Sequence, residues 1–525
     1  TVRTIMNLRE TVYDFIEYKY PFYLGNITVH APQTTDKDKS NKDDDSNNNN
    51  YLIVKDKYTG REVTRVWKAD RQSVEKAIEL AEGAKQQMAH FPHYKRKEVL
   101  RFVADNVRDM MEEFSIVLAL EAGKPITQAR TEVKRFVDTF ELAAEETDRI
   151  FEESGDYDNS QLNEGISFVS KRFPVGTVGM ISPFNFPLNL VAHKVAPAIA
   201  AGCPFVLKPS SKAPVSAMML GDLLSKAGLP IGAFSIVPCD RESASLLTTD
   251  PRIKLLTFTG SGTSGWSLLK QAEKKQVVLE LGGNAACIVD EDQKHVLKSV
   301  ADRVIYGAYY QSGQSCISVQ RVFIQENIYG EFAQLLIHRA TGAKVGDPLD
   351  EQTLVGPMIS EDAAVRAESW IKEAVDRGAT LLCGGQRQGA MLEPTILEFV
   401  PPDCKVYCEE VFAPVMVLEA YSDFRQLCDK INESKYGLQA GLFTDSMQKA
   451  FYAFDHLQVG GLVVGDTPAV RADAMPYGGT KDSGLGREGV RSAIEHMTEQ
   501  RVMLMKNIGT KLGYSAQMHS NTSLA

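Results

Sequence analysis

Two segments of this chain carry residues whose types and surroundings could do covalent chemistry. Cys316 ends the run GQSC, and its thiol could act as a nucleophile once it has lost its proton. Glu280 stands in LELGGN at the end of an apolar β run, and the glycines after it would leave its carboxylate open to a cleft. Such a carboxylate could activate water. Taken singly, each has an ordinary alternative: a buried small thiol and a surface carboxylate.

Two further segments could bind an anionic group. Asn185 lies in SPFNFP, where two prolines and two aromatic residues restrain the loop, so its amide could donate to a developing oxyanion; the alternative is a simple turn residue. The run FTGSGTSG, residues 258–265, follows an apolar strand and precedes a helical stretch. Its glycines would let the backbone approach a pyrophosphate, although the usual G-x-G-x-x-G spacing is missing.

The elements that must position these residues follow from the hydrophobic periodicity. Apolar residues recur three and four apart through residues 69–144, which predicts helices, most clearly at 93–111 and 130–144. From residue 176 short β runs alternate with helices, and a second α/β block follows at 285–464. This alternation predicts an α/β fold built on parallel, doubly wound sheets.

Residues 32–50, PQTTDKDKSNKDDDSNNNN, contain no large apolar side chain. Such a segment cannot bury enough apolar surface to offset its ordering entropy, so we expect a disordered loop. Segments with the composition of β-strands precede and follow residues 32–50. This pattern predicts a hairpin whose two strands are joined by the loop.

Composition excludes several classes of protein. Lys+Arg 58 against Asp+Glu 68 gives a net charge of −10 over 525 residues, which argues against a nucleic-acid or anionic-membrane partner. The eight cysteines are widely spaced, so we expect reduced thiols, a cytoplasmic location and no disulfide framework. The cysteines and histidines form no metal-binding pattern, and we expect no metal. The longest apolar run is too short to span a membrane. The chain begins at Thr1, which leaves open a removed leader.

Taken together and in order, the segments resemble the aldehyde dehydrogenase superfamily from about residue 51 to residue 502. The shared strings are PFNFP, LKPSSKAP, FTGSGTSG, LELGGN, GQSC, EEVFAPV and PYGGTKDSGLGRE, which begin at Pro183, Leu207, Phe258, Leu279, Gly313, Glu409 and Pro476. Within the superfamily, the resemblance is strongest to the branch that holds the plant family 21 enzymes, which are similar to succinate semialdehyde dehydrogenases.

The resemblance implies a three-part α/β fold. A Rossmann-like cofactor domain would comprise residues 1–156 and 174–283, and an α/β catalytic domain residues 284–484. A small β oligomerisation extension with a C-terminal arm would comprise residues 157–173 and 485–510, including a last strand near 501–505. Its edge strands would pair with a second subunit, so we expect a homotetramer built as a dimer of dimers, with a dimer as the alternative.

The resemblance also implies catalytic roles. Cys316 would attack the aldehyde carbon as a thiolate, and Asn185 with the Cys316 backbone N–H would form the oxyanion hole. The tetrahedral intermediate would pass a hydride to the nicotinamide and leave a thioester. Glu280 would then activate the water that hydrolyses it.

The implied cofactor is NADP, with NAD as a second possibility for the same site. Lys208 and Glu410 would hold ribose hydroxyls, and Phe412 would pack near the nicotinamide ribose. Further cofactor-binding positions are Ser182, Phe184, Gly260, Ser261 and Ser211. Ser211 stands where NAD-preferring members often carry a glutamate that would repel a 2′-phosphate, and Lys212 is adjacent.

Two arginines bear on the substrate. Members of the superfamily that oxidise anionic aldehydes carry arginines at places corresponding to Arg135 and Arg471, which implies binding of the succinate semialdehyde carboxylate. The ordinary alternative is a solvated or inter-subunit role. Other anionic aldehydes, glyceraldehyde 3-phosphate and phosphonoacetaldehyde, and lactaldehyde remain alternative substrates. Ser315 precedes the nucleophile where phosphate-binding relatives can carry arginine, which favours a carboxylate.

Three other kinds of protein are compatible with parts of the pattern. A CoA-acylating enzyme tends to lack the hydrolytic glutamate, whereas Glu280 is present. A non-catalytic protein on the same fold should have lost one of Cys316, Glu280 and Asn185. An esterase that uses no cofactor would have no need of Lys208, Glu410 or the glycine loop.

Overall fold

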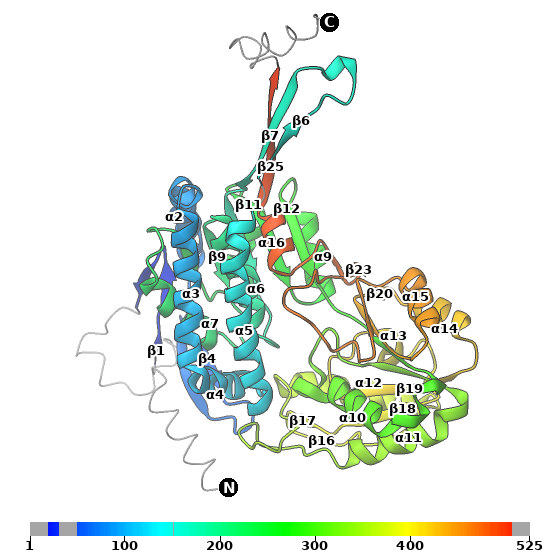
Figure 1. Cartoon of the computed structure of the whole chain (residues 1–525). Helices are drawn as coiled ribbons and strands as arrows, with labels where there is room; N and C mark the ends of the chain where they lie inside the picture. The colour runs from blue at the N-terminus through cyan, green and yellow to red at the C-terminus, as the bar shows by residue number, and fades with distance from the viewer. Residues whose placement is uncertain (1–18, 31–49, 151, 507–525) are drawn as a thin grey trace, which may run out of the picture.

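The computed structural model describes residues 19–30, 50–150 and 152–506, and the disordered loop predicted at 32–50 lies almost wholly outside them (Figure 1). The hairpin predicted across that loop is wrong. β3 (Ile27–Val29) pairs with β2 (Phe22–Leu24), whereas β4 (Tyr51–Lys55) pairs with β5 (Glu62–Trp67), which also pairs with β1 (Lys19–Tyr20). The two strands that flank the loop, β3 and β4, therefore belong to different sheets. Strand pairing of this kind cannot be predicted from local sequence.

The first large sheet has eight strands within the described residues, in the order β24-β12-β11-β8-β9-β10-β2-β3. The five strands from β12 to β10 are parallel, and the outer ones are antiparallel. The strands not yet given are β8 (Thr177–Ile181), β9 (Phe205–Lys208), β10 (Phe234–Ile236), β11 (Ile253–Thr259), β12 (Gln276–Glu280) and β24 (Gly484–Leu485). The parallel strands are buried runs of apolar residues, as expected for a sheet covered on both faces.

Helices cover this sheet and account for the helical pattern seen in the sequence (Figure 1). They are α2 (Arg71–Ala89), α3 (His93–Asp109), α4 (Met111–Ala122), α5 (Ile126–Glu146), α6 (Asn189–Ala201), α7 (Val215–Lys226), α8 (Arg241–Thr249), α9 (Gly262–Gln271) and α16 (Val490–His496). Every residue of α6 is buried, because α3, α5 and α16 pack around it. The two clearest predicted helices, at 93–111 and 130–144, are confirmed.

The second large sheet has seven strands in the part of the chain that the structure describes, in the order β15-β18-β19-β14-β13-β21-β22. All are parallel except the edge strand β15. They are β13 (Ala286–Val289), β14 (Arg321–Gln325), β15 (Thr380–Cys383), β18 (Thr395–Glu398), β19 (Val415–Tyr421), β21 (Gln439–Phe443) and β22 (Gly461–Val464). Two short ribbons, β16 (Arg387–Gln388) with β17 (Met391–Leu392) and β20 (Tyr436–Gly437) with β23 (Thr480–Lys481), join the loops.

The helices of this second unit are α10 (Leu297–Tyr309), α11 (Glu326–Thr341), α12 (Glu361–Asp376), α13 (Lys405–Cys408), α14 (Phe424–Asn432) and α15 (Met447–His456). With the first sheet, they confirm the predicted α/β class built on parallel sheets. Within the described ranges, no helix has both the length and the apolar character that a membrane span requires. The same residues contain no group of three or more potential side-chain metal ligands.

A three-stranded antiparallel sheet, β25-β7-β6, projects from the body of the molecule (Figure 1). β25 (Thr498–Lys506) pairs with β7 (Ile166–Pro174) over nine residues, and β6 (Glu152–Asp156) pairs with the other edge of β7. The predicted extension began at residue 157, so β6 was missed. Its sequence, EESGD, has no apolar alternation, and only its pairing with β7 makes it a strand. α16, which the prediction placed in the extension, packs instead on α5 and α6.

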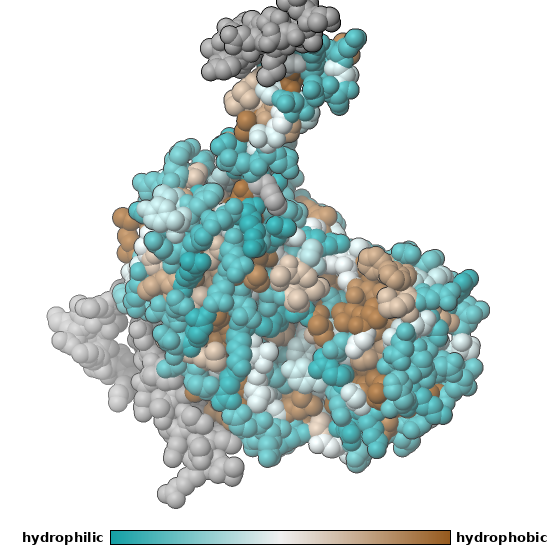
Figure 2. Space-filling view, viewed as in Figure 1, coloured by the Kyte–Doolittle hydropathy of each residue, from teal (hydrophilic) through white to brown (hydrophobic). Residues whose placement is uncertain are grey.

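Apolar side chains reach the outside of the molecule at several places, and two groups of them share an element (Figure 2). Val502, Met503 and Leu504 are more than half exposed on β25 of the projecting sheet. Met447, Phe451 and Phe454 are also more than 60% exposed and lie on one face of α15, since they are four and three residues apart. Both groups therefore leave large apolar side chains on the surface of the chain.

Candidate active site

The loop that carries Cys316 is held in an uncommon backbone conformation. Gln311 and Ser312 have φ values of 51° and 56°, and hydrogen bonds fix both: Gln128 Oε1 accepts the Gln311 N–H at 2.6 Å, and Ser312 Oγ donates to the Gly356 carbonyl at 2.8 Å. At Gly313 a Cβ would overlap the Ala413 carbonyl oxygen, so only glycine fits. Tertiary contacts therefore place the nucleophile loop.

Cys316 is partly buried, and its Sγ lies 3.0 Å from the Tyr477 hydroxyl. Burial raises the pKa of the Cys316 thiol to about 12, while the Tyr477 hydrogen bond and the positive charge of Arg471 act in the opposite direction. The thiolate that nucleophilic chemistry requires therefore depends on these polar neighbours.

Glu280 ends β12, and only 3% of its surface is exposed. Neither carboxylate oxygen has a hydrogen-bond partner among the described residues. Burial raises the pKa of this carboxyl well above its ordinary value, and the negative charge of Glu488 raises it further. A buried carboxylate with free oxygens and a raised pKa is suited to accept a proton from water.

The two glycines after Glu280 allow a close approach rather than an open cleft. A Cβ on Gly283 would collide with the Cys316 carbonyl oxygen, and one on Gly282 with the carboxylate of Glu410. The strand end that carries Glu280 is thereby brought against both the nucleophile loop and Glu410.

Asn185 is buried in the loop between β8 and α6, and its Oδ1 has no partner within the described structure. A buried ion pair holds this loop from behind. Glu132 Oε1 accepts the N–H groups of Leu188 and Asn189 at 3.0 Å each, and Glu132 Oε2 pairs with Lys124. The Lys124 ammonium in turn lies 3.8 Å from the centre of the Phe186 ring.

Several features along the predicted cofactor segments fit a dinucleotide. The Ser182 hydroxyl is buried without a partner among the described residues, and the Ser261 side chain does not cap α9. A Cβ at Gly262, where α9 begins, would meet no described atom within 4 Å, whereas Gly260 packs against the Phe258 ring. Free N–H groups and open space at a helix N-terminus suit a pyrophosphate.

The residues predicted to contact the cofactor riboses also carry suitable side chains. Lys208 ends β9, and its Nζ donates to Ser211 Oγ at 3.3 Å. Glu410 Oε1 accepts the Gly283 N–H at 3.0 Å, and burial raises the pKa of Glu410 to about 7. The Phe412 ring meets the Phe184 ring edge to face at 5.9 Å.

Arg471 lies beside the nucleophile through its contact with Tyr477. Its guanidinium carbon is 3.9 Å from the centre of the Tyr477 ring, and Nη2 donates to Glu488 Oε2 at 3.3 Å. The Arg471 side chain is only 5% exposed, and its Nε has no partner within the described residues. A buried guanidinium with a free donor is a natural partner for a carboxylate.

Arg135 has an internal partner that the sequence did not suggest. It donates from Nε and Nη2 to the two carboxylate oxygens of Asp473 at 3.0 and 2.7 Å. His193 Nε2 lies 2.8 Å from the same carboxylate. Arg135 and His193 thus share the Asp473 carboxylate as a partner inside the protein.

Four polar residues of the site were missed by sequence reasoning. Tyr477 and Glu488 lie in the string PYGGTKDSGLGRE, and Asp473 lies close to Arg471, but no role was given to them. Glu488 accepts from Lys194 at 2.8 Å and from Thr259 at 3.2 Å. The sequence around Lys194 could have predicted such a carboxylate. Lys194 lies in the apolar helix sequence NLVAHKVAPAIAA, and a buried lysine requires a buried carboxylate as its partner.

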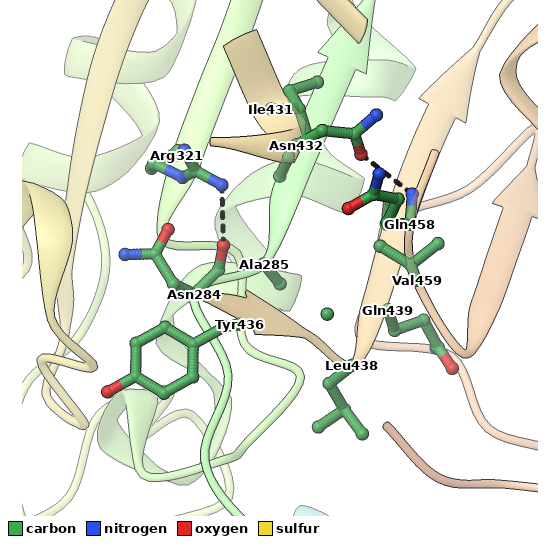
Figure 3. Close-up of a pocket in the computed structure, with 13 residues that line it drawn as sticks. Asn284, Ala285, Arg321, Ile431, Asn432, Tyr436, Leu438, Gln439, Gln458 and Val459 are labelled. Atoms are coloured by element: carbon green, nitrogen blue, oxygen red, sulfur yellow. Dashed lines mark hydrogen bonds between the residues drawn. The ribbon is translucent and has the colours of Figure 1, made fainter. Parts of the chain in front are cut away.

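A small hollow lies beside this site but is separate from it (Figure 3). Arg321 and Asn284 line one side, where Arg321 Nη2 donates to the Asn284 carbonyl oxygen at 3.1 Å. Asn432, Gln458 and Leu438 line the other side. Neither Cys316 nor Glu280 is among its lining residues.

A family model described as "Aldehyde dehydrogenase family" matches residues 44–503. The chain belongs to the aldehyde dehydrogenase family. This aldehyde dehydrogenase is similar to 3-sulfolactaldehyde dehydrogenase of Priestia aryabhattai, with 41% identity over 455 residues that cover 86% of this chain and 94% of the relative.

Two solved structures are also similar to this aldehyde dehydrogenase. Aldehyde dehydrogenase 21 from Physcomitrella patens, in complex with the reaction product succinate, is 47% identical, with a TM-score of 0.89 over 94% of this chain and 99% of that one. The NADP complex of glyceraldehyde-3-phosphate dehydrogenase GapN from Methanocaldococcus jannaschii is 36% identical, with a TM-score of 0.83 over 86% and 98%. The family, its fold and the oxidation of an aldehyde are thereby confirmed.

Proposed function

We propose that this aldehyde dehydrogenase oxidises succinate semialdehyde to succinate with NADP. The observation that carries the proposal is Arg471, a buried guanidinium with an unpartnered Nε among the described residues, stacked on the tyrosine that touches Cys316. A carboxylate held there would place the aldehyde end of a short chain near the thiol. The 47% identical relative whose structure holds succinate supports this choice.

The catalytic residues of the site have different roles in the proposed reaction. The Cys316 thiolate attacks the aldehyde carbon, a C–S bond forms, and the oxyanion accepts hydrogen bonds from the Cys316 N–H and the Asn185 amide. A bound nicotinamide cofactor would supply the acceptor for the hydride that this adduct loses as it becomes a thioester. Glu280 then takes a proton from water as the water attacks the thioester carbon, and the C–S bond breaks to release succinate and the thiolate.

The cofactor would lie along the carboxyl ends of the first sheet. Lys208 and Glu410 would bind ribose hydroxyls, Phe412 and Phe184 would flank the nicotinamide end, and the pyrophosphate would meet the start of α9. The remaining contacts would come from Ser182, Gly260 and Ser261.

NADP is proposed over NAD because no carboxylate stands at Ser211. Burial lowers the pKa of Lys208 and the nearby Cys239 raises it, while the charges of Arg241 and Asp240 act on it in opposite directions. A 2′-phosphate beside Ser211 would meet the Ser211 hydroxyl and the Lys208 ammonium that donates to it. Lys212 instead donates from Nζ to Ser360 Oγ at 3.4 Å.

A second candidate is another aldehyde with an anionic far end. The 41% identical relative is named for 3-sulfolactaldehyde, and a sulfonate would pair with Arg471 much as a carboxylate does. Glyceraldehyde 3-phosphate is disfavoured by Ser315, which adds no positive charge next to the nucleophile.

We also propose a homotetramer, a dimer of dimers, in the cytoplasm. The exposed apolar residues of β25 and of α15 supply two surfaces that association would bury, and β22 is an edge strand within the described residues. All eight cysteines are free, which suits a reducing compartment. Light scattering on the purified protein tests the assembly, and a monomer would contradict it.

A panel of aldehydes, each with NADP and with NAD, tests the function. We expect the highest kcat/KM for succinate semialdehyde with NADP, and a higher value for 3-sulfolactaldehyde would favour the second candidate. Cys316→Ala should abolish oxidation. Glu280→Gln should give one rapid turnover of reduced cofactor followed by a steady rate about 100-fold or more below the parent. A Cys316→Ala variant that still oxidises aldehydes would overturn the mechanism.

A further inference from the structure

Tyr477 has no role in the proposed reaction, although its side chain contacts the nucleophile. Its hydroxyl oxygen lies 3.0 Å from Cys316 Sγ, and the residue is 3% exposed. The ring packs in one apolar cluster with Ile317 and Leu438. The hydroxyl is therefore confined beside the sulfur and shielded from water.

Tyr477 is fixed from two directions, and both involve Glu488. The Tyr477 N–H donates to the Glu488 carbonyl at 2.9 Å, and the Glu488 N–H donates to the Tyr477 carbonyl at 2.6 Å. The Glu488 carboxylate also binds Arg471, whose guanidinium lies over the Tyr477 ring. Glu488 thus positions both the backbone of Tyr477 and the Arg471 guanidinium that lies over the Tyr477 ring.

This arrangement matches what a partly buried thiolate needs. A thiolate accepts hydrogen bonds, and a phenol O–H at 3.0 Å is a good donor to sulfur. A cation over the face of an aromatic ring draws on its electrons, which makes the phenol a stronger donor. Burial also holds the pKa of the Tyr477 hydroxyl well above its ordinary value, so Tyr477 keeps its proton at neutral pH.

We propose that Tyr477 is a catalytic residue of this enzyme: its hydroxyl donates a hydrogen bond to the Cys316 thiolate, and Arg471 strengthens that donor. The thiol proton leaves to solvent water, while Tyr477 retains its own. The proposal rests on the proposed role of Cys316 as the nucleophile.

The charges around Cys316 show why this donor matters. Burial is the largest effect and raises the pKa of the thiol, and the nearby carboxyls of Glu410 and Glu280 raise it further. Among the largest effects on this pKa, the Tyr477 hydrogen bond and the charge of Arg471 lower it. Loss of the hydroxyl would remove the larger of these two effects.

The test is the rate at which iodoacetamide alkylates Cys316 as a function of pH, followed by mass spectrometry of the Cys316 peptide. In Tyr477→Phe the ring and its contact with Arg471 remain, and only the hydroxyl is lost. We expect alkylation about tenfold slower than in the parent between about pH 7 and pH 9, which corresponds to a rise of about one unit in the thiol pKa.

Tyr309→Phe is the matched control. Tyr309 is also fully buried, and its hydroxyl donates to the Thr395 carbonyl at 3.2 Å, away from the sulfur. We expect this variant to alkylate at the parent rate. Equal alkylation profiles for Tyr477→Phe and the parent would overturn the proposal. Aldehyde oxidation by Cys316→Ala is a separate measurement and would overturn the proposed function instead.

A second measurement covers the case in which Tyr477→Phe does not fold. Parent protein made with fluorotyrosine has more acidic phenols and hence stronger donors. We expect faster alkylation of Cys316 in this protein than in the unlabelled parent, and an unchanged rate would contradict the proposal. Fluorotyrosine-labelled Tyr477→Phe, where it folds, should lose the acceleration.

Discussion

Arg135 and Asp473 are joined by two hydrogen bonds of 3.0 and 2.7 Å across 338 positions of the chain. Burial alone would raise the pKa of Asp473, but His193 and Arg135 hold it well below its ordinary value. Two of the donors of Arg135 are thereby engaged within the protein. Arg471 differs, since its Nε has no partner among the described residues and its hydrogen bond to Glu488 is 3.3 Å long.

From this difference we expect unequal effects on binding of an anionic aldehyde. Arg471→Ala should raise KM for succinate semialdehyde about tenfold to a hundredfold, and Arg135→Ala should raise it by a smaller factor. Both variants should leave KM for propanal nearly unchanged, because a neutral aldehyde has no charge to pair.

Arg130→Ala is the control for that comparison. Arg130 stands on the same helix as Arg135, and its guanidinium pairs at the surface with Glu112 and Glu351. It should leave KM for both aldehydes unchanged. Equal increases for succinate semialdehyde and propanal in Arg471→Ala would contradict carboxylate binding.

The pH dependence of thioester hydrolysis should report the burial of Glu280. The carboxyl must be ionised to accept a proton, and its pKa is raised first by burial and then by the charge of Glu488. The rate should therefore be lost as pH falls through a value well above that of an ordinary glutamate.

Glu488→Gln removes that negative charge and leaves the positive charges of Lys194 and Arg471 uncompensated. Both changes lower the pKa of Glu280, so the acid limb of hydrolysis should move to lower pH. Single-turnover measurement of deacylation checks this, and Glu280→Gln should lack the limb altogether. An acid limb at the same pH in Glu488→Gln and the parent would contradict the assignment.

Cofactor preference should depend on residue 211. Ser211→Glu places a carboxylate where the 2′-phosphate is proposed to bind, so kcat/KM with NADP should fall at least about tenfold while that with NAD changes little. Ser369→Glu, which adds the same charge at an exposed position on α12, is the matched control. An unchanged ratio of the two cofactors in Ser211→Glu would place the phosphate elsewhere.

The ion pair behind the Asn185 loop should matter to stability. Glu132→Ala leaves the Lys124 ammonium buried without its counter-charge and frees two backbone N–H groups at the start of α6. We expect the free energy of unfolding in chemical denaturation to fall by about 3–5 kcal/mol. Lys124→Met with Glu132→Leu should recover part of the loss, because no unpaired charge remains.

Glu112→Ala removes the carboxylate of an exposed ion pair with Arg130 and should change the free energy of unfolding by at most about 1 kcal/mol. A Glu132→Ala variant as stable as Glu112→Ala would show that the buried pair does not hold the loop.

Sequence pattern alone predicted much of this protein. Helical periodicity and the alternation of β runs with helices predicted the α/β class, because both depend on local spacing of apolar residues. The strings around Cys316, Glu280 and Asn185 predicted the family, which the family model confirms. The roles of these three residues stay predictions.

Only the tertiary structure decided how distant segments meet. β6 is a strand because it pairs with β7, and β3 and β4 pair with strands of different sheets. Strand pairing depends on neighbouring strands, which the sequence of a single strand does not specify. Tyr477 reached Cys316 across 161 positions, and Asp473 reached Arg135 in the same way. Hydrogen bonds and ion pairs of this kind depend on a few ångströms of side-chain placement, and only the packed fold sets those distances.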